Sequence, residues 1–328
     1  MKNKDEILNS IEQYIKQLPY PENPQGLYDP IKYVLSLGGK RIRPLLMIMA
    51  YNLYKEDTEK ILPQAVALET YHNFTLLHDD LMDNADMRRG FQTVHKKWDS
   101  NTAILSGDAM LIIAYKLFTE NIYGFQPESQ AKALKTFNDA TLGVCDGQQY
   151  DVDFENRNDV REEEYMEMIR LKTSLLLACA LKIGAELAGA NDSDAENLYK
   201  FGEKIGLAFQ LQDDLLDVYG DPAVFGKKIG GDILCNKKTF MLINALQLAD
   251  NKQKEALQNW INAKEYLPEE KIKGVTEIYD QINIKELCNN KIVQLFNDAL
   301  NDLSRVNIED AKKQPLIDFA NWLMTRNK

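Results

Sequence analysis

Apolar residues recur at helical spacing over long stretches of this 328-residue chain, and this periodicity restricts the fold more than any other feature. The stretches are 42–54, 64–78, 102–119, 165–188 and 195–217. Both ends of the chain follow the same spacing, and we expect Pro315 to open the last helix because proline is favoured in a first turn. No convincing ladder of alternating strands is found. The spacing therefore predicts an all-α fold.

The breaks between these helical stretches are short. They fall at 19–26, 123–127, 190–193 and 220–231, in segments rich in glycine, proline or polar residues. None is long enough to be a flexible linker between domains. We therefore expect a single domain over residues 1–328, built as one large helical bundle around a central active-site cavity.

Charge and composition exclude several classes of function. The formal net charge of -11 opposes binding to nucleic acid or to an anionic membrane surface. The most apolar stretch, near 175–181, ends at Lys182 and is far shorter than the ~20 residues that span a bilayer. The N-terminal residues lack the apolar core of a secretory signal, and the four cysteines form no CxxC pair. We expect a cytoplasmic protein without stable membrane insertion.

Two acidic clusters of the form DDxxD are the strongest chemical signal in the sequence. They are Asp79, Asp80 and Asp83 in HDDLMDN, and Asp213, Asp214 and Asp217 in QDDLLDV. On a helix, the first and last aspartate of each cluster share a face about one turn apart, where like charges repel. One cluster alone is as easily a solvated helix face, but a second copy makes an accident improbable.

Magnesium is the cation that suits these carboxylates. The residues beside the clusters, such as Leu81 and Leu215, are apolar, so the acids are costly there without a cation. Mg²⁺ prefers oxygen ligands, takes one or two protein carboxylates and completes its shell with water and phosphates. We therefore expect the two clusters to face each other across a bound diphosphate.

Basic residues near the acidic clusters would complete a diphosphate site. Lys40, Arg41 and Arg43 follow a glycine pair in SLGGKRIRP, and Arg88 and Arg89 follow the first acidic cluster. Guanidinium groups suit bidentate contacts to phosphate oxygens. Any one basic pair is more often solvated surface, but this reading is weak for all of them together.

The glycine-rich segment GKKIGGDILCNKKTF, after the second cluster, is compatible with a loose phosphate-binding loop. It contains Lys227, Asp232, Lys237 and Thr239. It lacks the GxxxxGK[ST] pattern and no strand precedes it, which disfavours a nucleotide-binding P-loop.

In order and spacing, these motifs resemble those of the trans-isoprenyl diphosphate synthases, the polyprenyl synthetase family of farnesyl, geranylgeranyl and longer-chain synthases. The matching segments, between Gly38 and Thr239, are GGKRIRP, the first DDxxD with its trailing RRG, LSGDAM, GQQYDVDFE, Lys172-Thr173, and the second DDxxD with its GK loop. The family commonly has glycine where Asn236 stands, but asparagine tolerates the same left-handed backbone. The resemblance implies a helical bundle of the isoprenoid synthase type.

Carried over by position, the resemblance implies a role for each matching residue. Asp79, Asp83 and Asp213 would be direct Mg²⁺ ligands, with Asp80, Asp214, Asp217 and Asp232 supporting three ions directly or through water. Arg88, Lys172, Lys227 and Lys237 would hold the allylic diphosphate, and Lys40, Arg43, His72 and Arg89 would hold isopentenyl diphosphate. Thr173 and Gln210 would lie near the reacting carbons, and Arg326 and Lys328 loosely match a basic tail that closes over isopentenyl diphosphate in some relatives.

The implied activity is the head-to-tail, all-trans condensation of isopentenyl diphosphate with dimethylallyl, geranyl or farnesyl diphosphate by a homodimeric transferase. A terpene cyclase or squalene-type synthase is the nearest alternative, but a cyclase needs no isopentenyl diphosphate site such as GGKRIRP. A non-catalytic partner subunit is the other alternative, and two complete acidic clusters argue against it.

Product length in this family is limited by side chains below the first acidic cluster on the same helix. Phe74 lies five residues before Asp79, hence ~7.5 Å deeper along the helix, and Tyr71 lies a further turn below. Ordinary aromatic core packing is the alternative interpretation. One phenylalanine beside the smaller Thr75 resembles geranylgeranyl synthases, so we expect a twenty-carbon product, with fifteen-carbon farnesyl diphosphate as the alternative.

Overall fold

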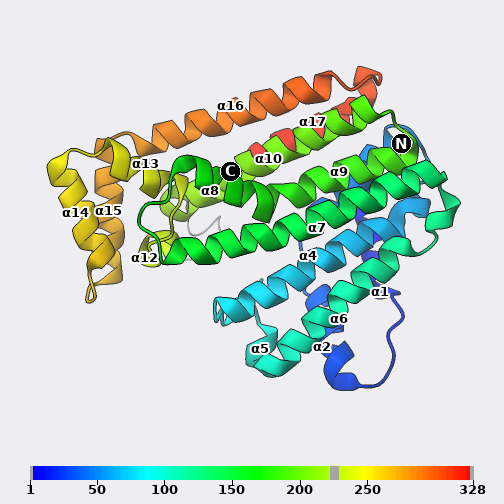
Figure 1. Cartoon of the computed structure of the whole chain (residues 1–328), viewed down its shortest axis with the longest axis horizontal. Coiled ribbons are helices and arrows are strands. Elements are labelled where there is room, and N and C mark those ends of the chain that lie inside the picture. The colour runs from blue at the N-terminus through cyan, green and yellow to red at the C-terminus, as the bar shows by residue number, and fades with distance from the viewer. Residues whose placement is uncertain (1–2, 222–228, 326–328) are drawn as a thin grey trace. The chain divides into compact units, whose positions relative to one another are not determined.

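The computed structural model describes residues 3–221 and 229–325, which are mostly helical (Figure 1). Within these ranges the only strands are β1 (Met87–Arg88) and β2 (Phe91–Gln92), which form one antiparallel pair. The all-α prediction is confirmed. Two compact units are distinguished, Met1–Thr141 with Cys179–Leu198, and Leu142–Ala178 with Tyr199–Lys328, and each is described by itself. The single domain remains a prediction.

The helices fall into these units as follows. The first unit contains α1 (Lys4–Lys16), α2 (Gln25–Ser36), α3 (Ile42–Asn52), η1 (Thr58–Ile61), α4 (Leu62–Met82), α5 (Val94–Lys97), α6 (Ser100–Thr119) and η2 (Ile122–Gly124). The second contains α8 (Glu162–Ile169), η3 (Arg170–Ser174), α12 (Gly231–Leu234), α13 (Phe240–Leu248), α14 (Asn251–Asn262), α15 (Pro268–Gln281), α16 (Ile284–Ser304) and α17 (Asp310–Met324). The helices α7 (Pro127–Glu155), α9 (Leu175–Ala188) and α10 (Asp192–Tyr219) contribute to both.

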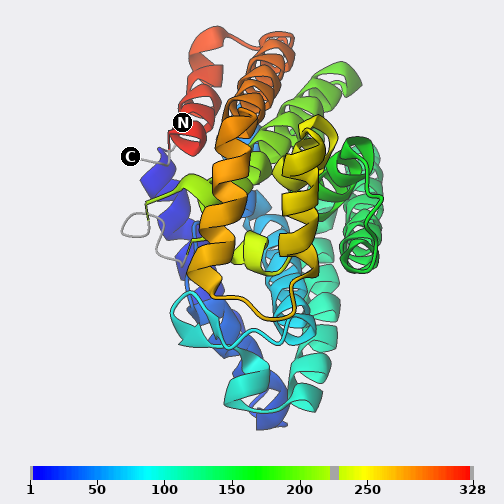
Figure 2. The ribbon, with the colours of Figure 1, turned by 90° about the vertical axis from the view of Figure 1, so that its left-hand side faces the viewer.

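In the first unit, α4 is the helix that carries the first acidic cluster. It packs against α3 and runs beside α6, as Figures 1 and 2 show. All residues from Leu62 to Tyr71 are buried, which is typical of a core helix that is enclosed on every side. The helix ends at Met82 with Asp83 as its C-cap. The buried stretch therefore fixes the position of the acidic end.

The helix α6 is long and apolar. Asp99 caps its start by accepting a 2.8 Å hydrogen bond from the Thr102 amide. By length and composition, Ser100–Gly124 is apolar enough to cross a membrane, although 39% of that window is buried. This is weak evidence of a span, because the core helix of a soluble protein passes the same test. Leu105 and Ile112, two turns apart on one face, are 60% and 67% exposed.

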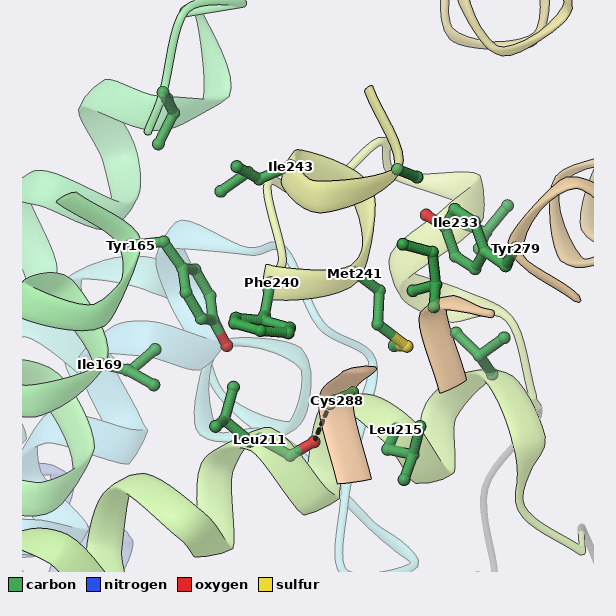
Figure 3. Packing of buried hydrophobic residues seen from close by; sticks show 14 of the residues in the cluster. Tyr165, Ile169, Leu211, Leu215, Ile233, Phe240, Met241, Ile243, Tyr279 and Cys288 are labelled. Carbon is green, nitrogen blue, oxygen red and sulfur yellow. Dashed lines mark hydrogen bonds between the residues drawn. The ribbon is translucent and has the colours of Figure 1, made fainter. Parts of the chain in front are cut away.

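The core of the second unit holds α10, which carries the second acidic cluster. Leu211 of α10 packs among Tyr165 of α8, Phe240 and Met241 of α13 and Cys288 of α16 (Figure 3). The Cys288 thiol donates a weak 3.8 Å hydrogen bond to the Leu211 carbonyl. Burial of side chains of this size contributes ~1.5–3 kcal/mol each. This packing fixes the rotation of α10 and hence the direction of its aspartates.

The helix expected over 165–188 is interrupted by η3, a π-helical turn at Arg170–Ser174. The backbone of α7 approaches this turn closely, since a Cβ added to Gly147 would lie 2.4 Å from the backbone nitrogen of Lys172. A single wide turn leaves the apolar spacing on either side almost unchanged, so periodicity does not reveal it. Such π-bulges are frequent at functional sites.

The prediction that Pro315 opens the last helix is wrong. The helix α17 begins at Asp310, and Pro315 lies inside it. Lys313 is buried at 5% exposure, and its ammonium donates to the Ser304 carbonyl at 3.2 Å. The residues that begin the helix are mostly polar, so they lack the apolar spacing that would have extended the predicted helix.

Candidate active site

The first acidic cluster lies at the C-terminal end of α4, beside the β1–β2 hairpin. Arg88 of β1 holds Asp80, with its Nε 2.7 and 2.8 Å from the two carboxylate oxygens. The same guanidinium lies 3.8 Å from Asp79. Burial raises the pKa of Asp80, while the bound Arg88 acts in the opposite direction. The cluster is thus partly neutralised from within the protein.

The GGKR segment before α3 adopts an unusual backbone. Gly38, Gly39 and Arg41 all have positive φ, at 72°, 139° and 47°. A Cβ on Gly39 would lie 2.9 Å from the guanidinium carbon of Arg89, so glycine is needed for this approach. Arg89 donates to the Gly38 carbonyl. The glycine pair therefore brings Arg89 against the segment that carries Lys40 and Arg43.

Arg41 holds this segment in place, although the resemblance to the synthase family implied no role for this residue. It is 2% exposed and donates to Glu12 at 2.7 Å, to Glu69 at 2.9 Å and to the Leu35 carbonyl at 2.7 Å. Glu69, also buried, accepts a further bond from the Asn73 amide at 3.2 Å. A buried guanidinium with three acceptors is well compensated. Arg41 therefore anchors the segment to α1, α2 and α4.

Arg43 and His72 lie in a positive environment within the first unit. The buried Nε of Arg43 has no hydrogen-bond partner among the described residues. Burial lowers the pKa of Arg43 to about 10; Glu69 opposes this change and Arg89 adds to it. Burial, then the charges of Arg43 and Arg89, lower the pKa of His72 well below 6.5. Such a cluster of cations and a neutral imidazole suits an anion.

In the second unit, Asp214 is held by neutral donors. It is 3% exposed, accepts from the Tyr165 hydroxyl, and accepts from the Gln210 amide at 2.9 Å. The Gln210 oxygen in turn accepts from Thr173 at 3.0 Å. Burial raises the pKa of Asp214, and the nearby charge of Lys237 opposes that rise. One hydrogen-bonded chain thus connects the π-turn to the second acidic cluster.

A pocket in the second unit brings several predicted residues together. Its lining includes Lys172, Thr173, Gln210, Asp214 and Lys237, with Asp151 and Tyr165. The Lys172 ammonium pairs with Asp151 at 2.6 Å. The wall of the pocket therefore carries two aspartates, two lysines and the neutral oxygens of Tyr165, Thr173 and Gln210.

Asp217 of the second cluster contacts the segment that follows it. Asp217 accepts from the Asp232 amide at 2.9 Å, and the Lys237 ammonium lies 4.0 Å from the Asp232 carboxylate. Asp213 is on α10, one residue before Asp214. Lys227, Arg326 and Lys328 lie outside the described residues.

An aromatic column lies below the first acidic cluster. Phe74 contacts the rings of His78 and Tyr71, with ring centroids 4.9 and 5.4 Å apart. Tyr71 then contacts Phe137, at 6.2 Å, and donates from its hydroxyl to the Thr141 carbonyl at 2.7 Å. The hydroxyl of Thr75 is bonded to the His72 carbonyl. Phe74 and Tyr71 thus belong to one packed column of rings.

Sequence reasoning missed three residues that hold the site. Tyr165 binds Asp214, Asp151 binds Lys172, and Glu69 binds Arg41. Asp151 stands within the GQQYDVDFE motif, so it carried a signal, whereas Tyr165 and Glu69 look like ordinary helix residues. Within the described residues, no three His, Cys, Asp or Glu side chains gather in a group that could hold a metal ion.

The family model named polyprenyl synthetase matches residues 24–282. The chain belongs to the polyprenyl synthetase family. It is 41% identical over 273 residues to a short chain isoprenyl diphosphate synthase of Methanocaldococcus jannaschii, covering 83% of this chain and 81% of that one. As a family member it is a chain-elongating prenyltransferase, as the motifs predicted.

Solved structures agree on the fold. A crystal structure of a geranylgeranyl pyrophosphate synthase superposes with a TM-score of 0.93 at 42% identity, with all of both chains covered. A geranylgeranyl pyrophosphate synthase of Corynebacterium glutamicum, complexed with isoprenyl diphosphate and magnesium, has a TM-score of 0.82 at 29% identity and covers 98% of this chain and 96% of its own. The predicted isoprenoid synthase fold is confirmed.

The depressed pKa of His72 makes stability depend on pH. Because the folded protein holds His72 neutral where the unfolded chain protonates it, the unfolded state binds more protons below pH 6.5. Stability is therefore lost as pH falls from 6.5 toward the lower folded pKa, by at most about 1.4 kcal/mol per pH unit from this group.

We expect His72→Gln to reduce the fall in the free energy of unfolding below pH 6.5. Urea unfolding in steps from pH 8 to pH 5 measures it. The difference between variant and wild type at pH 8, where both side chains are neutral, serves as the control. Equal slopes for the two proteins below pH 6.5 would contradict the assignment.

Proposed function

We propose that this enzyme is a geranylgeranyl diphosphate synthase that condenses isopentenyl diphosphate with an allylic diphosphate. The observation that supports this proposal most is the positive environment of Arg43, His72 and Arg89, which suits a diphosphate other than the one at the acidic clusters. Elongation needs two diphosphate sites, whereas a cyclase needs one. The geranylgeranyl synthases among its structural relatives agree with this reading.

The aspartate carboxylates of the two acidic clusters, with that of Asp232, are suitable ligands for magnesium. All are hard oxygen donors, and Mg²⁺ usually takes one or two protein carboxylates and completes its shell with water and phosphate. We assign Asp79, Asp83 and Asp213 as ligands, with Asp80, Asp214, Asp217 and Asp232 in support, for three ions. Bound magnesium would draw negative charge onto the leaving diphosphate.

The protein's own residues then divide the remaining tasks. Arg88, Lys172, Lys227 and Lys237 hold the allylic diphosphate as it leaves, and Lys40, Arg43, His72 and Arg89 hold isopentenyl diphosphate. The Thr173 and Gln210 oxygens, with the Lys172 carbonyl, face the developing positive charge. The double bond of isopentenyl diphosphate attacks the allylic carbon, and the released diphosphate accepts the proton. Apolar walls exclude water that would quench the cation.

The activity is tested by incubating the enzyme with isopentenyl diphosphate and each allylic primer, with and without Mg²⁺. We expect Asp79→Ala and Asp213→Ala to lower turnover by more than ~10- to 100-fold. That range is the loss of activity or metal affinity when a residue that only supports a metal ligand is removed. Their melting temperatures should change little, because each substitution also relieves repulsion between neighbouring acids.

The matched control is Asp139→Ala, which removes a surface aspartate paired with Lys135 on α7. This variant should retain wild-type turnover. Full activity of either cluster variant at saturating Mg²⁺ would refute the metal assignment.

Phe74 is the proposed floor for the growing chain. It is in contact with Tyr71 below and His78 above, and the next wall of the column is the buried Tyr71 ring. With Phe74 intact, a twenty-carbon product is expected, and fifteen carbons is the alternative.

We expect Phe74→Ala to shift the products toward longer chains, because removal of the ring opens space down to Tyr71. Chain lengths are measured by chromatography of the dephosphorylated products. Phe125→Ala is the control, since Phe125 is buried against Tyr51, outside this column. Unchanged product length in Phe74→Ala would show that Phe74 is core packing alone.

We propose that the enzyme is a homodimer with the exposed apolar face of α6 covered by a second copy. Leu105 and Ile112 are exposed on one face of α6, and exposed apolar faces often mark protein–protein interfaces. A cytoplasmic location fits the four free cysteines, which a reducing compartment maintains.

Replacing Leu105 and Ile112 together by aspartate should convert the dimer to monomer, because two charges would be buried at the interface. Light scattering after size exclusion gives the mass directly. Leu248→Asp, at a position 56% exposed on α13, should leave the mass unchanged. A dimer that persists in the double variant would place the interface elsewhere.

A further inference from the structure

Lys271 of α15 is a buried lysine with only neutral hydrogen-bond partners. It is 1% exposed, and within the described part of the chain no carboxylate lies within ion-pairing distance of its ammonium. The ammonium donates to the Asn236 side-chain oxygen at 2.8 Å and to the Leu234 carbonyl at 3.4 Å. It also lies 4.4 Å from the centre of the Tyr266 ring. A buried cation is costly, so these contacts hold it where it is.

Asn236 directly precedes Lys237 and has a left-handed backbone. Its φ of 53° is left-handed, so glycine would suit the backbone equally. The side chain, however, is used at both ends: its oxygen accepts from Lys271, and its amide donates to the Ile261 carbonyl at 3.0 Å. Asn236 is therefore tied to α14 and α15, which pack side by side (Figure 1).

The next residue in the chain is Lys237. Its backbone nitrogen donates to the Asp232 carbonyl at 2.9 Å, which closes the turn, and the Asp232 nitrogen donates to the Asp217 carboxylate at 2.9 Å. The turn that bears Lys237 is thus attached to the second acidic cluster on one side. On the other side, Asn236 attaches it to the α14–α15 pair.

We infer that Lys271 is a positioning residue for the allylic diphosphate site, acting through the Asn236 side chain to hold the backbone of Lys237 in place. Lys271 does not contact the pocket that Lys172, Asp214 and Lys237 line. The inference rests on the proposed function, because it needs Lys237 to bind the allylic diphosphate. A purely structural strut would change stability without changing the affinity for one substrate.

The experiment separates these cases with paired variants of the full-length enzyme. Lys271→Met removes the donor at similar length, and Asn236→Gly removes the acceptor while keeping a residue that tolerates the left-handed backbone. The double variant removes both partners. Lys273→Met, an exposed lysine on the same helix, is the matched control, and Lys237→Ala is the reference for loss of the binding residue itself.

KM is measured for the allylic diphosphate that supports the fastest turnover and for isopentenyl diphosphate, together with melting temperature. We expect each single variant to raise the allylic KM by about two- to tenfold, the range for loss of one hydrogen bond. The KM for isopentenyl diphosphate should stay within about twofold. The double variant should raise the allylic KM no further than the larger single effect, because both substitutions break the same contact.

Two results would overturn the inference, and they are distinguishable. If Lys237→Ala raises the allylic KM while Asn236→Gly and Lys271→Met leave it unchanged, Lys271 is only a strut. If Lys237→Ala leaves the allylic KM unchanged, the proposed role of Lys237 fails and the inference fails with it. Should Lys271→Met not fold, Asn236→Gly tests the attachment as a whole, since it removes the contacts to Lys271 and Ile261 together and leaves the lysine in place; an unchanged allylic KM in this variant overturns the inference.

Discussion

The buried ion pair between Arg41 and Glu69 is the interaction on which the basic half of the site depends. A guanidinium at 2% exposure requires compensation, and Glu69, Glu12 and the Leu35 carbonyl provide it. These acceptors come from three helices, and Arg41 contacts all of them with its own backbone in the left-handed region. That backbone turns the chain sharply between the glycine pair and α3. Arg43, two residues later, is consequently placed with a buried Nε that no described group accepts from.

The buried carboxylates of the two acidic clusters are stabilised by different kinds of partner. Asp80 is held by the cation of Arg88, whereas Asp214 is held by the neutral Tyr165 and Gln210. Burial raises the pKa of both carboxylates. Neutral donors orient Asp214 without cancelling its charge, so that carboxylate keeps its attraction for a metal cation. Arg88, by contrast, must share its charge between Asp80 and any phosphate that arrives.

The sequence predicted the parts of this molecule that depend on local pattern. Apolar spacing located the long helices, and two DDxxD motifs with their basic neighbours identified the chemistry. Contacts between residues far apart in sequence left no such pattern. Tyr165 and Asp214 are 49 residues apart, and Arg41 and Glu69 are 28 apart, so neither pair is visible as a motif. The early start of α17 was missed for another reason, because the residues that begin this helix are mostly polar and lack the apolar spacing.

The departures from ideal backbone geometry occur where chemistry needs side chains at close range. The π-turn at Arg170–Ser174 contains Lys172 and Thr173, and both line one pocket with Asp214. In a regular helix, adjacent residues diverge by about 100°, so a wider turn changes which neighbours can share a wall. Gly147 permits the turn because it has no Cβ. A Cβ at this position would lie 2.4 Å from the backbone nitrogen of Lys172. Gly39 has a similar role beside Arg89. Because glycine has no side chain, the Arg89 guanidinium can approach the backbone at Gly39, and its positive charge then contributes to the site.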